Sequence, residues 1–223
     1  MCPCGGSLAD DPALHCADVI SRIHRLAETG ALLDISTLSD ARAVAEKAHW
    51  VDVDNKLVEV IPAARTVYLQ APATALSSIL ERLLAAPLTS PTTRNTRLIT
   101  IDVRYGGPDL ADVAERLGLS VDTFVRRHQE VEYEVAFFGF APGQAFFAEI
   151  PADLRVPRRS VPRTRVPSGA LAIANEFTII YPESSPGGWN LIGHRVGPPL
   201  WVPGAQPPNA VDVGDRIRFV DVT

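Results

Sequence analysis

Four arginines lie close together in a stretch of the sequence that contains no acidic residue. Arg158, Arg159, Arg163 and Arg165 fall within eight residues, in a chain whose formal net charge is −5. A guanidinium group binds carboxylate or phosphate through paired hydrogen bonds, so the cluster predicts a site for a small anion. The alternative is that these arginines belong to a solvated surface loop, and composition does not decide between the two.

Arg163 and Arg165 are the first candidates for a catalytic role. Residues two apart on an extended segment share a face, so both guanidinium groups are expected to face one anion, with Thr164 opposite. Fixed cations help most where negative oxygen develops in a transition state. The competing interpretation pairs them with Glu183, Asp153 or another chain. If the arginines are free, Arg163→Ala should abolish activity and leave the melting temperature nearly unchanged.

His128 is a further catalytic candidate, at the point where a predicted helix gives way to a strand. It can serve as a general base near neutral pH, or it can bond a carbonyl group and hold this corner of the fold. Tyr133 is expected to shape a pocket rather than to react. Ser185 has no base placed beside it and is not expected to be a nucleophile. The backbone N–H groups of Gly187 and Gly188 can bind an anion.

Proline and glycine are concentrated around these candidates. Twelve of the 19 prolines fall between Pro142 and Pro208. Proline fixes φ and glycine permits positive φ, so such a segment is typical of backbone held in defined turns. Apolar runs at residues 170–174 and 177–181 interrupt it, which favours short strands over a disordered tract.

Composition narrows the function classes. The chain has 223 residues, enough for one large or two small domains, and a pI near 5.5, which favours neither nucleic acid nor an anionic membrane as a partner. No apolar run reaches the ~18 residues of a membrane helix, and the first residues lack the pattern of a signal peptide, so we expect a cytoplasmic protein. Cys2, Cys4 and Cys16 are expected to lie in a frayed, reduced N-terminus and to bind no metal.

The first part of the chain alternates helix and strand patterns, which predicts an α+β layer with helices on one face of a sheet. Residues 1–9 are expected to be mobile, and 87–96 to be a linker. The predicted helices span residues 10–29, 40–49 and 72–86, and the predicted strands span residues 31–36, 57–61 and 66–69.

The second part shows many short strands and one pair of helices. The expected strands span 97–105, 131–140, 170–174, 177–181 and 216–220, and the expected helices span 109–117 and 120–128. This pattern favours a closed or nearly closed β-barrel, which leaves no exposed sheet edges. A glycine-rich phosphate loop is not expected, because Gly106-Gly107-Pro108 lacks the Gly-Lys-Ser/Thr that would follow.

Several motifs occur in a fixed order along the second part. They are YGGPDLADVAERL at 105–117, His128, Tyr133, GFAPG at 139–143, PRRSVPRTRVPSG at 157–169, YPESSPGGWNLIG at 181–193 and GDRIRF at 214–219. In these motifs the sequence resembles the family that comprises allophanate hydrolase subunit 1, the B subunit of 5-oxoprolinase and the kinase inhibitor KipI. The resemblance is strong over residues 96–223 and weaker but collinear over residues 31–72.

The resemblance implies a ferredoxin-like α+β domain over residues 1–95 and a cyclophilin-like β-barrel over residues 96–223. It implies a component of an ATP-dependent hydrolase that opens the lactam of 5-oxoproline, acting on a small anionic substrate. The partner would be a protein like the C subunit of 5-oxoprolinase or allophanate hydrolase subunit 2, and ATP would be used by the whole complex. The substrate-binding residues that we expect are Tyr133, Pro142, Gly143, Gln144, Pro167, Gly169, Thr178, Ser185, Gly187 and Gly188.

Two other functions occur among proteins that the sequence resembles. One is a regulatory protein that inhibits a histidine kinase, and the other is the carboxyltransferase part of a biotin-dependent urea carboxylase, the only case in which biotin would be involved. The sequence also departs from the family pattern. Gln144 stands where the family has phenylalanine, and residues 175–179 replace Gly-x-Gln-Thr-Gly with bulkier side chains, which predicts a narrower pocket wall.

Overall fold

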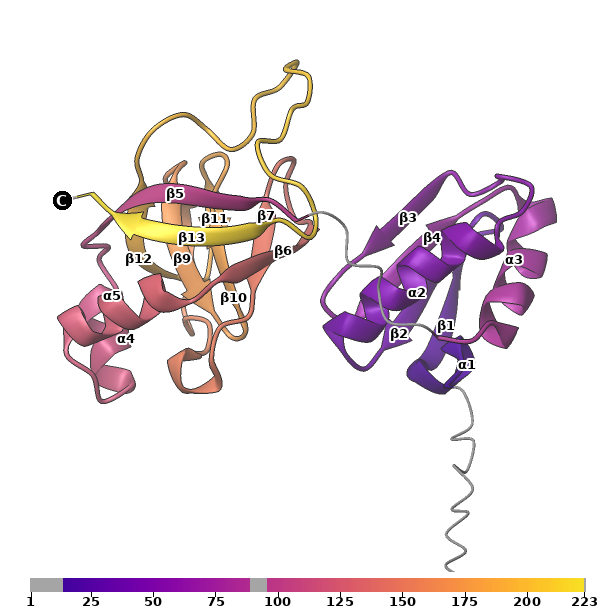
Figure 1. Ribbon diagram of the computed structural model, residues 1–223, viewed down its shortest axis with the longest axis horizontal. Helices are drawn as coiled ribbons and strands as arrows, with labels where there is room; N and C mark the ends of the chain where they lie inside the picture. The colour runs from indigo at the N-terminus through magenta and orange to yellow at the C-terminus, as the bar shows by residue number, and fades with distance from the viewer. Residues whose placement is uncertain (1–13, 89–95, 223) are drawn as a thin grey trace, which may run out of the picture. The chain divides into compact units, whose positions relative to one another are not determined.

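The computed structural model describes residues 14–88 and 96–222, and it divides into two compact units, Met1–Thr92 and Thr93–Thr223. Figure 1 shows a small sheet with helices in the first unit and a barrel with further helices beside it in the second. The linker predicted at 87–96 falls mainly on residues 89–95, which lie outside the described residues, as do the predicted mobile residues 1–9.

The first unit is an antiparallel four-stranded sheet with two longer helices. Its strand order is β1-β2-β4-β3. Buried residues alternate along β2 and β4, and they form one core with the inner faces of α2 and α3. The elements are α1 (Cys16–Val19), β1 (Ile20–Leu26), β2 (Gly30–Ile35), α2 (Leu38–Val51), β3 (Glu59–Pro62), β4 (Thr66–Gln70) and α3 (Ala73–Ala85).

This topology confirms the ferredoxin-like prediction, with one rearrangement. From β2 onward the chain runs strand–helix–strand–strand–helix, as in a βαββαβ unit. The edge position beside β2, which the last strand of such a unit would fill, is taken by β1 from the N-terminal side.

The helix predicted over residues 10–29 is wrong where the structure describes it. Only Cys16–Val19 is helical, and Ile20–Leu26 is a strand that pairs with β2 from Ile20↔Ile35 to Leu26↔Gly30. The pairing to β2 outweighs an apolar spacing that also suits a helix, which is how tertiary context overrides local preference. Cys16, expected in a frayed terminus, is fully buried in this unit.

The second unit is a closed seven-stranded barrel, as the sequence predicted. The strand order is β10-β7-β6-β13-β5-β12-β9, with β9 pairing back to β10, and only β13 and β5 run parallel. The barrel strands are β5 (Leu98–Tyr105), β6 (Tyr133–Phe138), β7 (Ala145–Ala148), β9 (Ala170–Ala174), β10 (Phe177–Ile180), β12 (Asn190–Arg195) and β13 (Arg216–Asp221).

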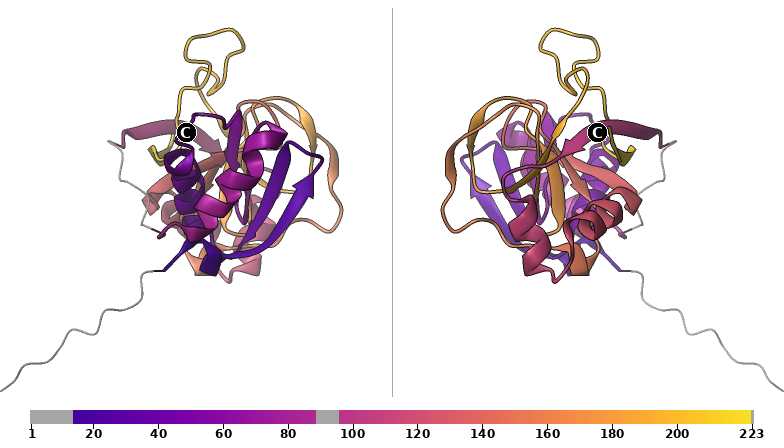
Figure 2. Two further views of the ribbon diagram at one scale, coloured as in Figure 1. Left: turned by 90° about the vertical axis from the view of Figure 1, so that its right-hand side faces the viewer. Right: turned by 90° about the vertical axis from the view of Figure 1, so that its left-hand side faces the viewer.

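Other elements of this unit lie around the barrel. They are α4 (Leu110–Arg116), α5 (Val121–Glu130), the 3₁₀ turn η1 (Ala152–Leu154), and the separate two-stranded sheet of β8 (Arg163–Val166) and β11 (Ser185–Gly187). The loop 196–215 between β12 and β13 extends away from the strands in every view (Figures 1 and 2).

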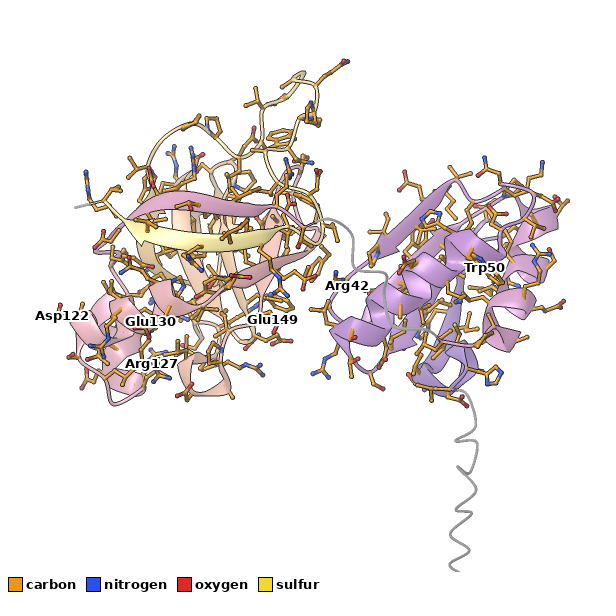
Figure 3. All side chains as sticks on the ribbon, in the orientation of Figure 1. Arg42, Trp50, Asp122, Arg127, Glu130 and Glu149 are labelled. Atoms are coloured by element: carbon orange, nitrogen blue, oxygen red, sulfur yellow. The ribbon has the colours of Figure 1, made fainter. Side chains whose placement is uncertain are left out.

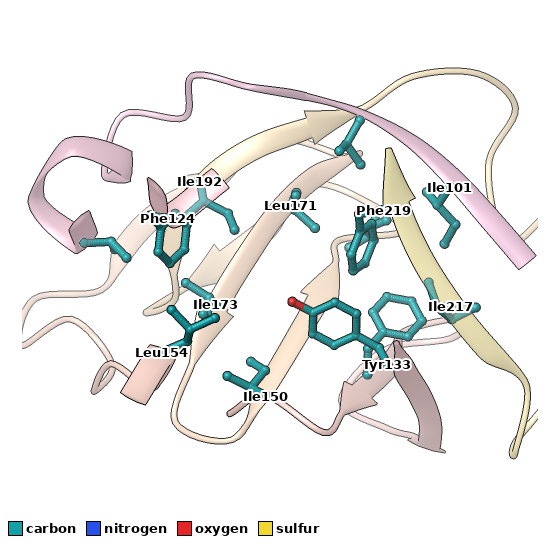
Figure 4. Close-up of a cluster of buried hydrophobic side chains, with 14 of the residues drawn as sticks. Ile101, Phe124, Tyr133, Ile150, Leu154, Leu171, Ile173, Ile192, Ile217 and Phe219 are labelled. Carbon is teal, nitrogen blue, oxygen red and sulfur yellow. The ribbon is translucent and has the colours of Figure 1, made fainter. Parts of the chain in front are cut away.

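Alternating side chains from the strands fill the barrel interior. Ile101, Tyr133, Leu171, Ile217 and Phe219 converge there, and each is at most 4% exposed (Figure 4). Phe219 lies edge-on to Tyr133, with ring centroids 5.1 Å apart. The interior is therefore a packed core rather than an open channel.

The turn after β5 approaches β12 very closely. A Cβ atom on Gly107 would lie 2.3 Å from the Leu191 carbonyl oxygen and 2.6 Å from the Gly193 nitrogen, both of them backbone atoms. The backbone N–H groups of Gly106 and Gly107 both donate to the carbonyl oxygen of Ile192. Only glycine fits at position 107 without displacement of the backbone.

We therefore expect Gly107→Ala to destabilise the protein by about 1–3 kcal/mol, because the added methyl group forces the backbone of β12 to move. Thermal unfolding would show a melting temperature lower by several degrees. Gly188→Ala is the control, since a Cβ there meets its nearest atom at 3.7 Å, an ordinary contact. Equal melting temperatures for the two variants would contradict this account.

Candidate functional site

Asp109 organises the region that carries the arginines. Its carboxylate is 2% exposed and lies directly before α4, after the Gly-Gly-Pro turn. Arg163 binds it with both terminal nitrogens, Nη1 to Oδ2 at 2.8 Å and Nη2 to Oδ1 at 2.7 Å. Arg159 Nη1 donates to Oδ1 at 2.6 Å, and the backbone N–H of Leu191 donates to Oδ2 at 2.7 Å. One carboxylate thus joins α4, the arginine segment (residues 157–166) and β12.

The ionisation of Asp109 follows from these contacts. Burial alone would raise the pKa of its carboxyl group, because a charged group loses solvation. Hydrogen bonds from Arg163 and the Leu191 N–H, together with the charges of Arg163 and Arg159, outweigh that effect and hold the pKa below its ordinary value. Asp109 is therefore an anion at neutral pH, and it neutralises one of the two guanidinium groups that it binds.

Arg163 and Arg165 do not face one position. Arg163 turns to Asp109, whereas Arg165 is exposed and its Nε donates to Ser184 Oγ at 3.2 Å. The pairing of β8 with β11 explains the difference, because Val166 is opposite Ser185 while Arg163 is opposite Gly187. That register places one extra residue in β8, a bulge that interrupts the two-residue alternation on which the prediction depended.

Within this chain, Arg163 pairs with neither of the two acids predicted as its structural partners, Glu183 and Asp153. It binds Asp109, and Asp153 instead pairs with Arg127. Among the described residues, no ion pair is recorded for Arg158 or Arg165. Arg158 lies over the Trp189 ring, with its guanidinium carbon 5.4 Å from the centroid.

His128 lies inside the barrel, fully buried, and takes part in several hydrogen bonds. Tyr105 Oη is 2.8 Å from Nδ1, Thr178 Oγ1 is 3.2 Å from Nε2, and the Tyr133 hydroxyl donates to the His128 carbonyl oxygen at 3.1 Å. Each ring nitrogen of His128 thus has one hydroxyl partner, Tyr105 at Nδ1 and Thr178 at Nε2.

Burial lowers the pKa of His128 to about 3, so its imidazole is neutral at physiological pH. Both ring nitrogens are engaged and the side chain has no exposed surface. Of the two roles left open by the sequence, this geometry favours the one that holds the fold over the general base.

The other predicted site residues fall into two groups. Tyr133 and Thr178 are in the barrel interior with His128, both fully buried. The remainder lie outside the barrel, in the turns and short strands before β7, after β8 and around β11. These are Pro142, Gly143, Gln144, Pro167, Gly169, Ser185, Gly187 and Gly188. The structure therefore does not bring all the predicted residues to one site.

The outer group is held by close contacts with aromatic rings. Gly143 has φ +72 and lies against the Trp201 ring, and Gly169 has φ +80 and lies against the His194 ring. Gly187 lies against the Tyr181 hydroxyl, where a Cβ would be 2.2 Å away. Ring contacts of this kind leave room for no side chain, which accounts for the glycines of these motifs.

The residues that depart from the family pattern lie directly before β7 and in the turn and strand that follow β9. Gln144 is 2% exposed, and its Oε1 has no hydrogen-bond partner in the described part of the chain. Asn175 takes φ +52 in the turn between β9 and β10, a conformation that asparagine tolerates. Phe177 packs edge-on against Phe137 and Phe146, so this wall of the barrel is filled by aromatic rings.

Two hollows of the second unit lie away from the arginine segment. One, of about 410 Å³, is lined in part by Arg127, Glu130 and Glu149, which Figure 3 labels. The other, of about 360 Å³, includes Tyr105 and Asp221. Neither of these two hollows is lined by Arg163 or Arg165.

The sequence does not predict Asp109 or Tyr105 as supporting residues, and it indicates Arg159 only as a member of the arginine cluster. Asp109 and Tyr105 both belong to the YGGPDL motif, which indicates a turn, a helix and the family resemblance but no role for either side chain. The sequence carries no signal for the Asp109–Arg163 ion pair, because the two residues are 54 positions apart and only the closed barrel brings them together.

Within residues 14–88 and 96–222, no three His, Cys, Asp or Glu side chains are grouped so as to hold a metal ion. Over the same residues, none of the helices is both long enough and apolar enough to cross a membrane.

The barrel, the second sheet and the ordered motifs define a known class of protein. The family model for the carboxyltransferase domain, subdomain C and D, matches residues 21–211, and the chain belongs to this family. It is 38% identical to the 5-oxoprolinase B subunit of Escherichia coli O157:H7 over 210 residues, which cover 90% of this chain and 95% of that protein.

Solved structures show the same likeness. The crystal structure of TTHA0988 is similar with a TM-score of 0.71 and 35% identity over 87% of this chain, and the chain spans 40% of TTHA0988. Kluyveromyces lactis urea carboxylase covers 90% of this chain with a TM-score of 0.70, while the chain spans 22% of that enzyme. At 13% identity this second likeness concerns the fold alone.

The stability of the protein should depend on pH through His128. Its pKa is about 3 in the folded state and about 6.5 when unfolded, so between these values only the unfolded state binds the proton. Protonation of His128 in the unfolded state should therefore lower the free energy of unfolding by up to about 1.4 kcal/mol for each pH unit below 6.5. Urea unfolding at pH 7, 6 and 5 measures it.

The control for this pH dependence is His128→Gln, which retains a donor and an acceptor but does not titrate. The stability of this variant should change less between pH 7 and 5 than that of the wild type. Identical slopes would mean that His128 does not remain neutral in the folded protein.

The contacts of Arg163 change the expectation for Arg163→Ala. The substitution leaves the buried Asp109 with one guanidinium group, and should cost about 2–3 kcal/mol, less than the loss of a complete buried pair. For a chain of this size the melting temperature should fall by roughly 5–10 °C. Arg165→Ala, which removes an exposed side chain, should stay within about 0.5 kcal/mol of the wild type. Similar stabilities for both variants would contradict the assigned contacts.

Proposed function

We propose that this chain is the B-type component of a hetero-oligomeric, ATP-dependent 5-oxoprolinase that opens the lactam of 5-oxoproline to give glutamate. The observation that carries the proposal is the 38% identity to the B subunit of a 5-oxoprolinase, which extends over nearly the whole of both chains. The partner is a C-type 5-oxoprolinase component, and the complex works in the cytoplasm, where ATP is available.

Within this complex we assign the anionic substrate to the outer side of the arginine segment. Opening a lactam develops negative charge on the carbonyl oxygen, and fixed cations stabilise that charge. Arg165 is exposed and has no ion pair among the described residues, so it is the candidate to contact substrate. Arg163 supports the segment through Asp109. Because this surface is open, the partner protein would complete the site.

ATP belongs to the proposed complex rather than to a phosphate site on this chain. The glycines that most resemble a phosphate loop are Gly106 and Gly107, and their N–H groups already donate to Ile192. The proposal therefore assigns no nucleotide contact to Gly106 or Gly107. The likeness to urea carboxylase concerns the fold alone, so biotin is not part of the proposal.

The test is reconstitution of the complex. The chain is co-expressed and co-purified with the other 5-oxoprolinase components, and glutamate release from 5-oxoproline is measured with and without ATP. We expect ATP-dependent release, and a loss of about 10²-fold or more in kcat/KM for Arg165→Ala, the range found when a donor to a developing anion is removed. Arg116→Ala, an exposed arginine on α4, is the control and should retain full activity.

A well-assembled complex that releases no glutamate would overturn the proposal. Loss of histidine-kinase autophosphorylation when the chain alone is added in stoichiometric amount would instead favour a regulatory protein. Equal losses for Arg165→Ala and Arg116→Ala would show that Arg165 does not contact the substrate, and the proposed activity would still stand.

A further inference from the structure

We propose that Asp109 is a positioning residue for the anion site: its buried carboxylate fixes the arginine segment on the barrel and thereby sets where Arg165 lies. The geometric part of this inference stands on the contacts of Asp109 alone. The part that concerns substrate rests on the proposed function.

The carboxylate binds both ends of a short loop. Arg159 and Arg163 flank residues 160–162, and both guanidinium groups reach Asp109. The middle of the loop has little packing of its own, since Val161 is 70% exposed. The loop is therefore held at its two ends rather than at its middle, by the Asp109 contacts and by the Arg159 N–H, which donates to the Gly188 carbonyl oxygen at 2.8 Å.

Arg165 depends on this arrangement through β8. Arg163 is the first residue of β8, and Arg165 is two residues further along the same strand. β8 pairs only with the three-residue β11, and an isolated two-stranded sheet is marginally stable by itself. The ion pairs at Arg163 therefore fix the start of a strand that its own sheet holds weakly.

The charge balance of the cluster also fits a positioning role. Asp109 accepts four hydrogen bonds, two from Arg163 and one each from Arg159 and the Leu191 N–H, so it has little capacity left for a substrate. One negative charge against two guanidinium groups leaves the segment positive, and Arg158 and Arg165 add to that charge. The segment thus stays attractive to an anion while it is held in place.

Limited digestion with trypsin tests the geometric part on the full chain. Trypsin cleaves after arginine, so the bonds Arg159–Ser160, Arg163–Thr164 and Arg165–Val166 report directly on opening of the segment. Asp109→Asn keeps the size of the side chain and removes its charge. We expect cleavage at these three bonds to be at least about tenfold faster than in the wild type, because breaking a buried pair shifts a local opening equilibrium by more than that.

The matched control is Asp215→Asn. Asp215 is also a buried carboxylate, 4% exposed, that binds an arginine, Arg97, and a backbone N–H, but it contacts no part of the arginine segment. Its loss should not accelerate cleavage at the same three bonds. If Asp109→Asn does not fold, Arg163→Lys replaces it, since lysine keeps the charge but cannot bind both carboxylate oxygens through a rigid fork.

Kinetics in the reconstituted complex test the substrate part. On Asp109→Asn or Arg163→Lys, a positioning residue should raise KM for the anionic substrate and also lower kcat, with a loss of about tenfold in kcat/KM, since Arg165 remains but is displaced from the substrate and from the developing charge. A purely structural role would lower the active fraction, and with it the apparent kcat, and leave KM unchanged.

Three results overturn the inference. Cleavage at wild-type rates in folded Asp109→Asn or Arg163→Lys shows that Asp109 does not hold the segment. Equal acceleration in Asp215→Asn shows that the effect is global. Faster cleavage with an unchanged KM shows that the segment is held but does not position substrate. If no complex with 5-oxoprolinase activity can be formed at all, the proposed function fails, and the digestion still decides the geometric part.

Discussion

The buried carboxylate of Asp109 is the constraint on which the outer face of the barrel depends. Three segments that are far apart in the sequence, the start of α4, the arginine segment and β12, meet at its two oxygens. Removing a charge from water is costly unless every lone pair is used, and here all the contacts are charge-assisted or come from a backbone N–H. The arginine segment therefore has one well-defined position although its own sheet has only two short strands.

The barrel contains a second buried polar centre, which is neutral, whereas the centre at Asp109 is charged. Around His128 every group is neutral, and each hydroxyl and ring nitrogen has a partner inside the core. Such a network adds specificity to the packing without burying charge. The charged centre is thus on the outside of the barrel, where a substrate or a partner can reach its neighbours, and the neutral centre is inside, where it supports the fold.

Much of the fold could be predicted because local signals agreed with it. The strand at Leu98–Tyr105 alternates, Ser120 caps α5, and glycines mark the tight turns. The prediction failed at Ile20–Leu26, where pairing to β2 outweighed helical spacing, and at β8, where a bulge broke the expected alternation. Asp109 and Arg163 are 54 positions apart, and neither pattern nor spacing indicates a pairing that only the closed barrel creates.

The placement of β13 has a consequence for how the chain reaches this state. It lies between β5 and β6, runs parallel to β5, and brings Asp215 to Arg97, which is 118 positions earlier. A barrel closed by so distant a segment has a high contact order, and contacts of this kind form slowly. Until β13 has been synthesised, β5 and β6 each have one unpaired edge. Nascent chains would be prone to aggregate through these edges during that time.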